Sequence, residues 1–323
     1  MKNILITREI EKSGIKILED NGFQVKVNTD EKIPTQDEII KMLNENQYDA
    51  VVTLLTDKVD AAIFDATPNT KLFVNYASGF DNIDIAEAKK RGITVCNAPA
   101  PITSEAVAEH TLALMLALSA RIVEADQYVR DGKYVGWSPT NFIGTDVLGK
   151  TLGLVGVGRI GGRVGFYAKA LGMKVIYHDV NRNEQSEKEC GAEYCESLED
   201  LLKKADIVSI HVPLLESTKH LINWDKLSLM KKTAILINTS RGPVVDELAL
   251  TKALSEGLIA GAGLDVFEFE PKVTPELIKL QNVILTPHIA SASIEARVEM
   301  SEIVAKNIVE FFEDKEPTNK VNK

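Results

Sequence analysis

The stretch "TLGLVGVGRIGGRV", residues 151–164, decides the fold of the second half of this chain. An apolar strand pattern precedes its glycines, a helical pattern follows them, and the next predicted strand ends in Asp179, 18 residues after Gly161. In this context the spacing GxGxxG predicts a turn from strand to helix that binds the pyrophosphate of a dinucleotide. The three glycines permit the tight turn, the approach of backbone amides to phosphate, and close packing of the helix. The predicted cofactor residues of this turn are Gly156, Gly158, Arg159, Ile160 and Gly161.

The predicted strand end at Asp179 indicates which dinucleotide binds. Its carboxylate is expected to accept hydrogen bonds from the ribose hydroxyls of the adenosine and to repel a 2′-phosphate, which favours NAD over NADP. Arg182, three residues later, leaves some tolerance of NADP open. The alternative for Asp179 is a solvated strand end without a ligand.

Short β-branched runs alternate with amphipathic helical stretches along the chain, which is typical of an α/β fold with parallel sheets. A long apolar helix follows the break at 99–101, with Thr103 or Ser104 as its cap, and is expected to lie buried between domains or subunits. The last predicted helix, 293–315, is expected to return to the first domain. The predicted strands cover residues 3–7, 23–28, 50–55, 71–77, 93–97, 152–156, 174–179, 206–212, 234–240, 261–267 and 282–288.

Composition narrows the class of protein. The chain has 323 residues, is 45% hydrophobic and carries a net charge of -10, which disfavours nucleic acid as a partner. Its three cysteines, Cys96, Cys190 and Cys195, predict neither a disulfide framework nor a metal site. The start lacks the apolar core of a signal peptide, and no segment is long and apolar enough to suggest a membrane partner. A soluble cytoplasmic protein is therefore expected.

Polar residues follow the predicted strands of the second half where each strand ends. Because the carboxyl ends of parallel strands meet at one edge of a sheet, these side chains are predicted to converge beside the cofactor. An arginine, an acid and a histidine together suit the reduction of a 2-oxo acid, since they bind its carboxylate, support an imidazolium and donate a proton. Which acid takes part stays open at this point. The polar residues concerned are Thr239, Ser240, Arg241, Asp265, Glu268, Glu270 and His288. Val212 and Pro213, at the end of the strand 206–212, are predicted to bind the cofactor together with Thr239, Ser240 and Asp265.

The other four histidines are expected to be structural or exposed. His110 lies within the long apolar helix, and His178 is next to the ribose acid. His211 belongs to a strand pattern, and His220 lies in the loop "LLESTKHLI".

Together these patterns resemble the NAD-dependent D-2-hydroxyacid dehydrogenases over essentially the whole chain. The resemblance rests on "GFDNIDIAEAKKRGITVCNAP", "GKTLGLVGVGRIG", "HVPL", "INTSRGPVVDE", "GLDVFEFEP" and "LTPHIAS". It implies that Arg241, Glu270 and His288 are the catalytic residues and that Asp265 contacts the nicotinamide carboxamide. It also implies that backbone amides of Ser78 and Gly79 bind the substrate carboxylate. Glu268 is left without a role and is expected to be a solvated loop residue.

The resemblance also implies a fold of two Rossmann-like domains with the active site in the cleft between them. A flavodoxin-like substrate-binding domain is expected from residues 1–100 and 290–323. An NAD-binding domain with a doubly wound parallel sheet is expected from residues 101–289, including a dimerisation helix near 103–120.

Within this family, "LLTD" and "GWSPTNFIGTDVLGKT" are most similar to glyoxylate/hydroxypyruvate reductases. That similarity implies that Leu54 and Leu55 line the substrate pocket and that Trp137 reaches the active site of a partner subunit in a homodimer. The alternative for Trp137 is a simple packing residue. Two other functions stay open: D-lactate dehydrogenase activity on pyruvate, because one methyl group distinguishes the substrates, and a non-enzymatic NAD-sensing corepressor.

Overall fold

The computed structural model describes residues 1–322. The chain divides into two compact units. Unit 1 combines Met1–Thr103 with the segment from Ala292 onward, and unit 2 is Ser104–Ser291. Both units contain a parallel sheet covered by helices, so the predicted α/β class is confirmed.

Unit 1 is built on a five-stranded parallel sheet with the order β2-β1-β3-β4-β5, the flavodoxin-like order. Its central strands are buried on both faces, whereas the edge strand β2 has no fully buried residue. Such continuous burial explains why the central strands are apolar runs without alternation. The strands are β1 (Asn3–Ile6), β2 (Gln24–Val27), β3 (Ala50–Thr53), β4 (Leu72–Asn75) and β5 (Thr94–Cys96). The helices are α1 (Lys12–Asp20), α2 (Gln36–Asn44), α3 (Ala61–Ala66), α4 (Ile85–Lys90) and α13 (Ile294–Phe312).

Unit 2 has a seven-stranded parallel sheet with the order β12-β11-β10-β9-β6-β7-β8. The strand β6 pairs with β7 on one side and β9 on the other, so the strand order reverses beside it. The carboxyl ends of strands at such a reversal are where ligands bind in open α/β sheets. The strands are β6 (Thr151–Val155), β7 (Lys174–His178), β8 (Glu193–Tyr194), β9 (Ile207–Ile210), β10 (Ile235–Asn238), β11 (Gly261–Leu264) and β12 (Val283–Leu285).

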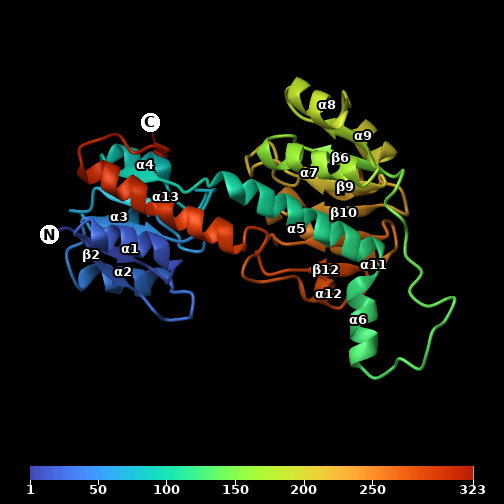
Figure 1. Ribbon diagram of the computed structural model, residues 1–323, viewed down its shortest axis with the longest axis horizontal. Helices are drawn as coiled ribbons and strands as arrows, with labels where there is room; N and C mark the ends of the chain where they lie inside the picture. The colour runs from blue at the N-terminus through green and yellow to red at the C-terminus, as the bar shows by residue number, and fades with distance from the viewer. Residues whose placement is uncertain (323) are drawn as a thin grey trace. The chain divides into compact units, whose positions relative to one another are not determined.

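Helices of unit 2 cover both faces of this sheet (Figure 1). The longest, α5, runs along the sheet, and a Cβ built on Gly263 of β11 would lie 3.1 Å from Leu118 Cδ1 and 3.2 Å from Leu114 Cβ of this helix. The strand glycine therefore allows the helix to pack closely. The helices are α5 (Pro101–Ser119), α6 (Ile122–Arg130), α7 (Arg159–Ala170), α8 (Glu184–Cys190), α9 (Leu198–Lys204), α10 (Trp224–Leu227), α11 (Glu247–Ser255) and α12 (Pro275–Ile278), with a 3₁₀ turn at Gly242–Val244.

Three details differ from the sequence-based expectations. The cap predicted at Thr103 or Ser104 is wrong, because α5 already begins at Pro101, whose fixed φ suits a first helical position. The two-residue strand β8 was not predicted. Most strands end before their predicted limits, so the polar residues at their ends lie in loops; Asp265, for example, follows the last residue of β11.

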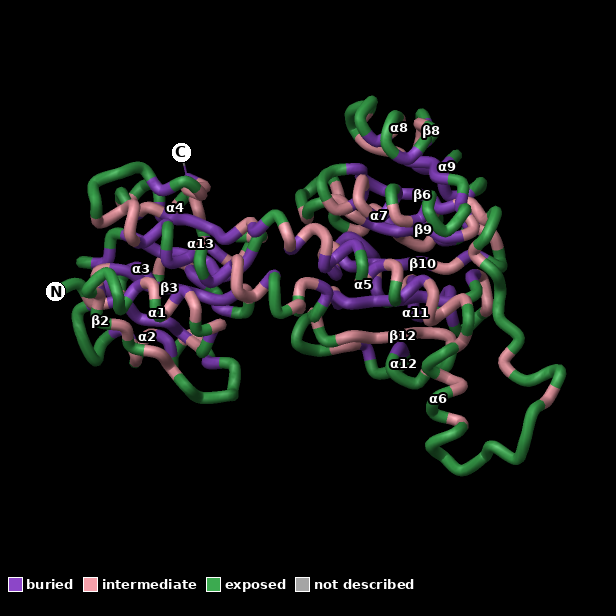
Figure 2. The backbone as a smooth tube through the Cα atoms, in the orientation of Figure 1, coloured by how far each residue is buried: buried purple, intermediate pink, exposed green. Residues whose placement is uncertain are grey.

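The segment after α5 is the most exposed part of unit 2. The helix α6 has no buried residue, and the irregular stretch 131–150 that follows is exposed along most of its length (Figure 2). Among residues 1–322, no single helix is long and apolar enough to cross a membrane; α5 and α6 meet that criterion only as a pair, and they are bent by 65°.

Candidate active site

The glycine loop joins β6 to α7 at the reversal of the strand order. Gly156 has φ +90°, and a Cβ there would lie 2.9 Å from Val212 Cγ1, so both the backbone angle and the space require glycine. A Cβ on Gly161 would lie 2.2 Å from Gly156 O, which lets α7 pack directly on the loop. At Gly158, the first residue before α7, a Cβ would meet no protein atom within 4 Å, and no side chain caps the helix. The open helix N-terminus, with exposed Arg159 and half-buried Ile160 in its first turn, fits a pyrophosphate.

The residues after β7 fold back onto this loop. Asp179 Oδ2 accepts a hydrogen bond from Val157 N at 2.9 Å, and Asn183 Nδ2 donates to Val157 O at 2.8 Å. One carboxylate oxygen of Asp179 is thereby fixed at the edge of the glycine loop, where the ribose of a dinucleotide is expected.

Arg182, the residue that could allow some binding of NADP, is paired with Glu187. Its Nε donates to Glu187 Oε1 at 2.7 Å, and its Nη2 donates to Glu187 Oε2 at 3.1 Å. The hydroxyl of buried Tyr177 also donates to Glu187 Oε1, at 2.7 Å. The bonds from Arg182 and then Tyr177 lower the pKa of Glu187, so the carboxylate remains charged and holds the guanidinium. This arrangement was not evident from the sequence, where Glu187 is one of many helical acids.

The loops after β9 and β10 complete the same edge of the sheet. Half-buried Val212 packs beside Gly156, and exposed Pro213 follows it. Desolvation of its ring lowers the pKa of His211 to about 3, although the residue as a whole is half-buried. Its Nε2 lies 2.8 Å from Ser209 Oγ, which agrees with the structural role expected for it.

The polar residues after β10 fix the segment that carries Arg241. Asn238 Oδ1 accepts from the amide and the hydroxyl of Ser240, and Asn238 Nδ2 donates to Arg241 O. Thr239 is buried, and its hydroxyl lies 2.9 Å from that of Thr111 on α5. Arg241 itself is half-buried, with Nη1 donating to Ser240 O at 2.8 Å.

The structure brings Glu270 and His288 together. Glu270 Oε2 lies 3.0 Å from His288 Nδ1, and Glu270 Oε1 accepts from Phe267 N at 3.0 Å. Burial acts to raise the pKa of Glu270, but His288, Phe267 N–H and the charge of Arg241 together hold it below its usual value. Glu270 is therefore a carboxylate at neutral pH, and its contact with His288 involves only Nδ1 of the ring.

His288 occupies an unusual backbone conformation that a buried carboxylate maintains. Its φ is +56°, in the left-handed region that non-glycine residues seldom adopt. Asp265 has no exposed surface, and its carboxylate accepts bonds from Thr286 Oγ1 at 2.6 Å, Ile289 N at 2.8 Å and Ala290 N at 2.7 Å. Asp265 thus fixes the loop on both sides of His288, and its contact with a carboxamide stays a prediction.

His110 belongs to the same network. Its Nε2 lies 3.1 Å from Thr286 Oγ1 and 3.6 Å from Asp265 Oδ1. This histidine of α5 therefore supports the loop of His288, which is consistent with a structural role.

Four of the predicted substrate residues lie in two loops of unit 1, whereas Arg241, His288 and Trp137 belong to unit 2. The carbonyls of Ser78 and Gly79 accept from Asn97 Nδ2 at 2.7 Å and Asn75 Nδ2 at 2.9 Å. Because a trans peptide points its N–H opposite its C=O, these bonds fix the directions of the Gly79 and Phe80 amides. Asn75 is the last residue of β4, and Asn97 directly follows β5. Polar residues at strand ends are visible in the sequence, so this pattern could have indicated both residues.

A second loop of unit 1 carries Leu54, which is buried, and Leu55, which is half-buried. Asn82 Nδ2 donates to Leu54 O at 3.1 Å and to Asp57 O at 2.9 Å, which ties this loop to the loop of Gly79. Asp57 Oδ2 accepts from Leu54 N at 2.8 Å. Burial outweighs that bond and raises the pKa of Asp57.

Comparison with known proteins agrees with this geometry. The family model "D-isomer specific 2-hydroxyacid dehydrogenase, NAD binding domain" matches residues 112–290. The chain is 50% identical to the glyoxylate reductase of Thermococcus litoralis, covering 99% of this chain and 96% of that protein. It is also 50% identical to the glyoxylate reductase of Korarchaeum cryptofilum, covering 99% and 95%.

The chain belongs to the D-isomer specific 2-hydroxyacid dehydrogenase family. The crystal structure of a Thermus thermophilus protein superposes on this dehydrogenase with a TM-score of 0.92, at 38% identity and with 99% of each chain covered. Unit 2 thus contains the NAD-binding domain of an oxidoreductase, and the cofactor inferred from the glycine loop is confirmed.

The structure of the dehydrogenase corrects the expectation for Glu268. Its side chain is only 11% exposed; Oε1 lies 2.6 Å from His220 Nε2, and Oε2 accepts from Glu247 N at 3.0 Å. The side chain of Glu268 is therefore mostly buried and hydrogen-bonded, and it is not a solvated loop residue. Spacing along the chain gave no sign of this, because its partners lie 21 and 48 residues away.

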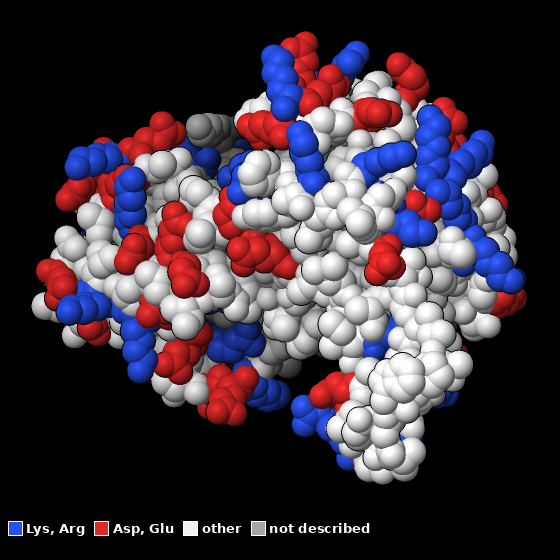
Figure 3. All heavy atoms as spheres, turned by 45° about the vertical axis from the view of Figure 1, so that its right-hand side comes forward, with Lys and Arg blue, Asp and Glu red and all other residues white. Residues whose placement is uncertain are grey.

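Trp137 does not pack within its own chain, since 84% of its surface is exposed. The alternative of a simple packing residue is therefore wrong for the single chain. Its neighbours Tyr134, Val135, Ile143 and Leu148 are exposed as well. Seen from the side in Figure 3, the projecting segment of the dehydrogenase presents a face with few charged side chains.

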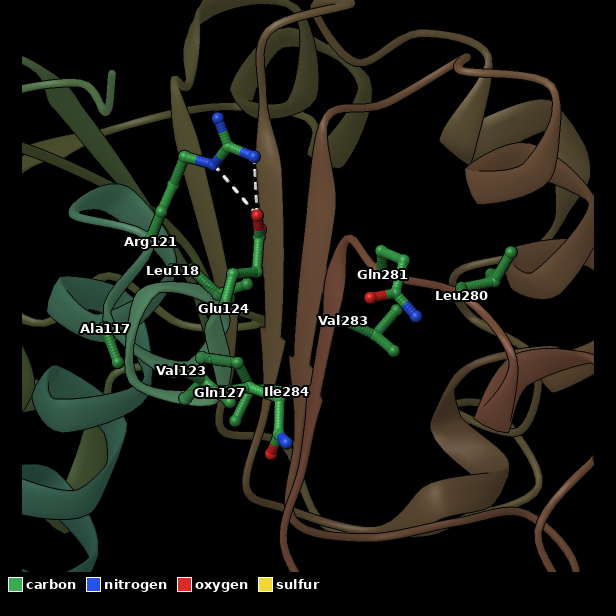
Figure 4. Close-up of a pocket in the computed structure, with 10 residues that line it drawn as sticks. All are labelled: Ala117, Leu118, Arg121, Val123, Glu124, Gln127, Leu280, Gln281, Val283 and Ile284. Atoms are coloured by element: carbon green, nitrogen blue, oxygen red, sulfur yellow. Dashed lines mark hydrogen bonds and ion pairs between the residues drawn. The ribbon is translucent and has the colours of Figure 1, made fainter. Parts of the chain in front are cut away.

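A small cavity of about 180 Å³ lies between the end of α5, the start of α6 and residues 280–284 (Figure 4). Arg121 and Glu124 are hydrogen-bonded to each other at its wall. Because residues 280–284 lead into the amino end of β12, the cavity lies at the sheet edge opposite His288. It is not the candidate active site of the dehydrogenase.

Proposed function

We propose that this enzyme reduces glyoxylate or hydroxypyruvate to the corresponding 2-hydroxy acid with NADH, the D isomer where the product is chiral. The contact of 3.0 Å between His288 and Glu270 at the carboxyl edge of the NAD-binding sheet carries this proposal. The two curated relatives at 50% identity, both glyoxylate reductases, favour the smallest 2-oxo acids.

When bound, NADH supplies the hydride for the carbonyl carbon of the 2-oxo group. Arg241 binds the substrate carboxylate and polarises this carbonyl with its planar guanidinium. His288 donates a proton to the carbonyl oxygen, and Glu270 stabilises the imidazolium that holds this proton. Asp265 keeps His288 in its left-handed conformation, so the ring does not need to reorganise during proton transfer.

We assign substrate binding to unit 1, the segments 1–100 and 290–323 in the sequence-based division. The predicted site is the loop of Ser78 and Gly79. The fixed directions of the Gly79 and Phe80 amides in this loop support binding of a carboxylate, because amides of set direction have little ordering cost on binding. Leu54 and Leu55 would line the pocket for a small substituent.

We also infer a homodimer, with the surface around α5, α6 and residues 131–150 as its interface. Trp137 and four further large apolar side chains that are exposed in this segment support it, since soluble monomers seldom expose such a cluster. Trp137 would then approach the active site of the partner. A cytoplasmic location is supported by the three cysteines, all of which are free and buried.

The test is steady-state oxidation of NADH with glyoxylate, hydroxypyruvate, pyruvate and a larger 2-oxo acid. The expected order of kcat/KM has glyoxylate or hydroxypyruvate first. Pyruvate first would indicate a D-lactate dehydrogenase, and no turnover with any of them would indicate a protein that only binds NAD.

A further inference from the structure

We propose that Glu268 and Glu247 are positioning residues that clamp the loop of Glu270 to the segment of Arg241. They would act on the reaction through the geometry of the Glu270–His288 pair and touch no substrate. This inference rests on the proposed function, because it assumes that Glu270 and His288 transfer the proton.

The carboxylate of each glutamate accepts a hydrogen bond from the backbone amide of the other. Glu247 N donates to Glu268 Oε2 at 3.0 Å, and Glu268 N donates to Glu247 Oε2 at 2.8 Å. Glu247 is the first residue of α11, so Glu268 satisfies an amide that has no partner within the helix. Each carboxylate therefore fixes the main chain beside the other, and the two segments are joined twice.

Further bonds fix the side chains themselves. Glu247 is 3% exposed, and its Oε1 accepts from Thr274 N at 2.8 Å and Thr274 Oγ1 at 2.6 Å. A buried carboxylate without a cation requires such a set of donors. His220, which lies 2.6 Å from Glu268 Oε1, is held by its own amide, which donates to Pro243 O at 2.8 Å.

Packing joins the same two segments independently of the hydrogen bonds. Gly242 follows Arg241, and a Cβ on Gly242 would lie 1.9 Å from Phe267 C and O and 2.5 Å from Glu268 N. The main chain beside Arg241 thus lies directly against the main chain at 267–268. No other residue type fits here without moving one of the two segments.

The clamped residues lead directly to the acid–base pair. Phe267 N, in the clamped stretch, donates to Glu270 Oε1 at 3.0 Å, while Glu270 Oε2 lies 3.0 Å from His288 Nδ1. A shift of Phe267 and Glu268 therefore moves Glu270 relative to His288. Proton transfer is sensitive to such shifts, since a misplacement of about 1 Å costs about a hundredfold in rate.

The test compares Glu268→Ala with Glu268→Gln. Alanine removes both bonds of the side chain, and we expect kcat to fall about ten- to a hundredfold. Glutamine retains an acceptor for Glu247 N, and we expect kcat within about threefold of wild type. KM for NADH should stay unchanged in both, because the hydrogen bonds described for the clamp involve neither the glycine loop nor Asp179.

The matched control is Glu276→Ala. Glu276 is exposed on α12, eight residues along the chain, and its loss changes the net charge by the same amount. It should leave kcat unchanged. If kcat fell as far in Glu276→Ala as in Glu268→Ala, a general charge effect would replace the clamp as the explanation. An unchanged kcat in Glu268→Ala would also overturn the clamp.

The pKa of Glu270 can be measured without substrate. It therefore tests the positioning role independently of protein stability and of the proposed function. The pKa of Glu270 is measured by carbon NMR titration of ¹³C-labelled glutamate, with Glu270→Gln for assignment. If the clamp positions Glu270, its pKa rises in Glu268→Ala because the bond to His288 weakens, and it stays nearly constant in Glu268→Gln.

Loss of a neighbouring negative charge alone would instead lower the pKa of Glu270 in both variants, because a nearby carboxylate disfavours ionisation. That result would overturn the inference, as would an unchanged pKa in Glu268→Ala. If the wild-type protein turned over none of the 2-oxo acids, the proposed function would be wrong. This titration would still decide whether Glu268 positions Glu270.

Discussion

The two units begin with the same topology and use the first helix of that topology in opposite ways. In unit 1 the N-terminus of α1 is filled by the protein itself: Glu11 Oε2 accepts from Ser13 N, and Ser301 Oγ of α13 accepts from Gly14 N at 2.8 Å. In unit 2 the N-terminus of α7 begins at Gly158, with no side-chain cap and open space above it.

This difference shows how one strand–turn–helix pattern can leave a helix N-terminus open in one unit and close it in the other. A helix N-terminus attracts an anion through its free amides and its dipole. Unit 1 satisfies these amides with its own carboxylate and hydroxyl, and unit 2 leaves them for a pyrophosphate. Function at this position therefore depends on the absence of a side chain, and only a comparison of the two helices makes that visible.

The largest effect is expected at the proposed proton donor, which lies in unit 2. His288→Ala removes this group, and kcat with glyoxylate should fall about a thousandfold, because general acid catalysis is worth roughly that factor. KM for NADH should change little. If the variant kept most of its kcat, the proton donor would be a group other than His288.

The pH dependence of kcat probes the same pair. The pKa of Glu270 is held below its usual value, so the support that its carboxylate gives His288 is present at neutral pH and is lost as the pH falls through that lowered pKa. In Glu270→Gln this support is absent at every pH, so the imidazolium of His288 loses its proton more easily. As the pH is raised, the variant should therefore lose reductase activity at a lower pH than wild type does. An identical pH profile would contradict the pairing.

The second largest effect tests the open helix N-terminus directly. Gly158→Asp gives α7 a carboxylate of its own, as Glu11 does for α1, and should weaken NADH binding about a hundredfold through repulsion of the pyrophosphate. Gly158→Asn has nearly the same shape without the charge and is the matched control. Equal loss in both variants, measured by fluorescence titration of NADH, would point to steric exclusion.

A smaller effect is expected at the ribose. Asp179→Ser should raise kcat/KM for NADPH about tenfold relative to NADH, because a like charge no longer faces the 2′-phosphate. Adding Glu187→Gln should release Arg182 and raise this ratio a few-fold further, since exposed ion pairs contribute about 1 kcal/mol or less. An unchanged ratio in Asp179→Ser would show that the carboxylate does not select the cofactor.

The smallest effect belongs to unit 1. Glu11→Ala should destabilise the protein by about 1 kcal/mol, the usual cost of losing a helix cap, and leave KM for NADH unchanged. Chemical denaturation measures the first value and steady-state kinetics the second. A change in KM for NADH would mean that the first turn of unit 1 takes part in cofactor binding after all.

Some residues of the candidate site could be predicted from the sequence, and others could not. Gly156, Gly158, Gly161 and Asp179 lie in one strand–turn–helix–strand unit, and their spacing in that context predicted the class of cofactor, which the family model confirms. Arg241, Glu270 and His288 were found because parallel strands end at one edge, with family resemblance choosing between Glu268 and Glu270. Glu187, Asn75 and Asn97 were missed, because a hydrogen bond between distant segments leaves no local pattern.

The sequence by itself determined the α/β class, the parallel sheets, the dinucleotide loop and the family, because each depends on periodicity or on spacing within one local unit. Only the tertiary structure decided that Glu268 is held by His220 and Glu247, that Arg182 is bound to Glu187, and that Asp265 is fully enclosed. The physical reason is that burial and hydrogen bonding join segments tens of residues apart, and the energy of a carboxylate depends on which donors the fold brings to it.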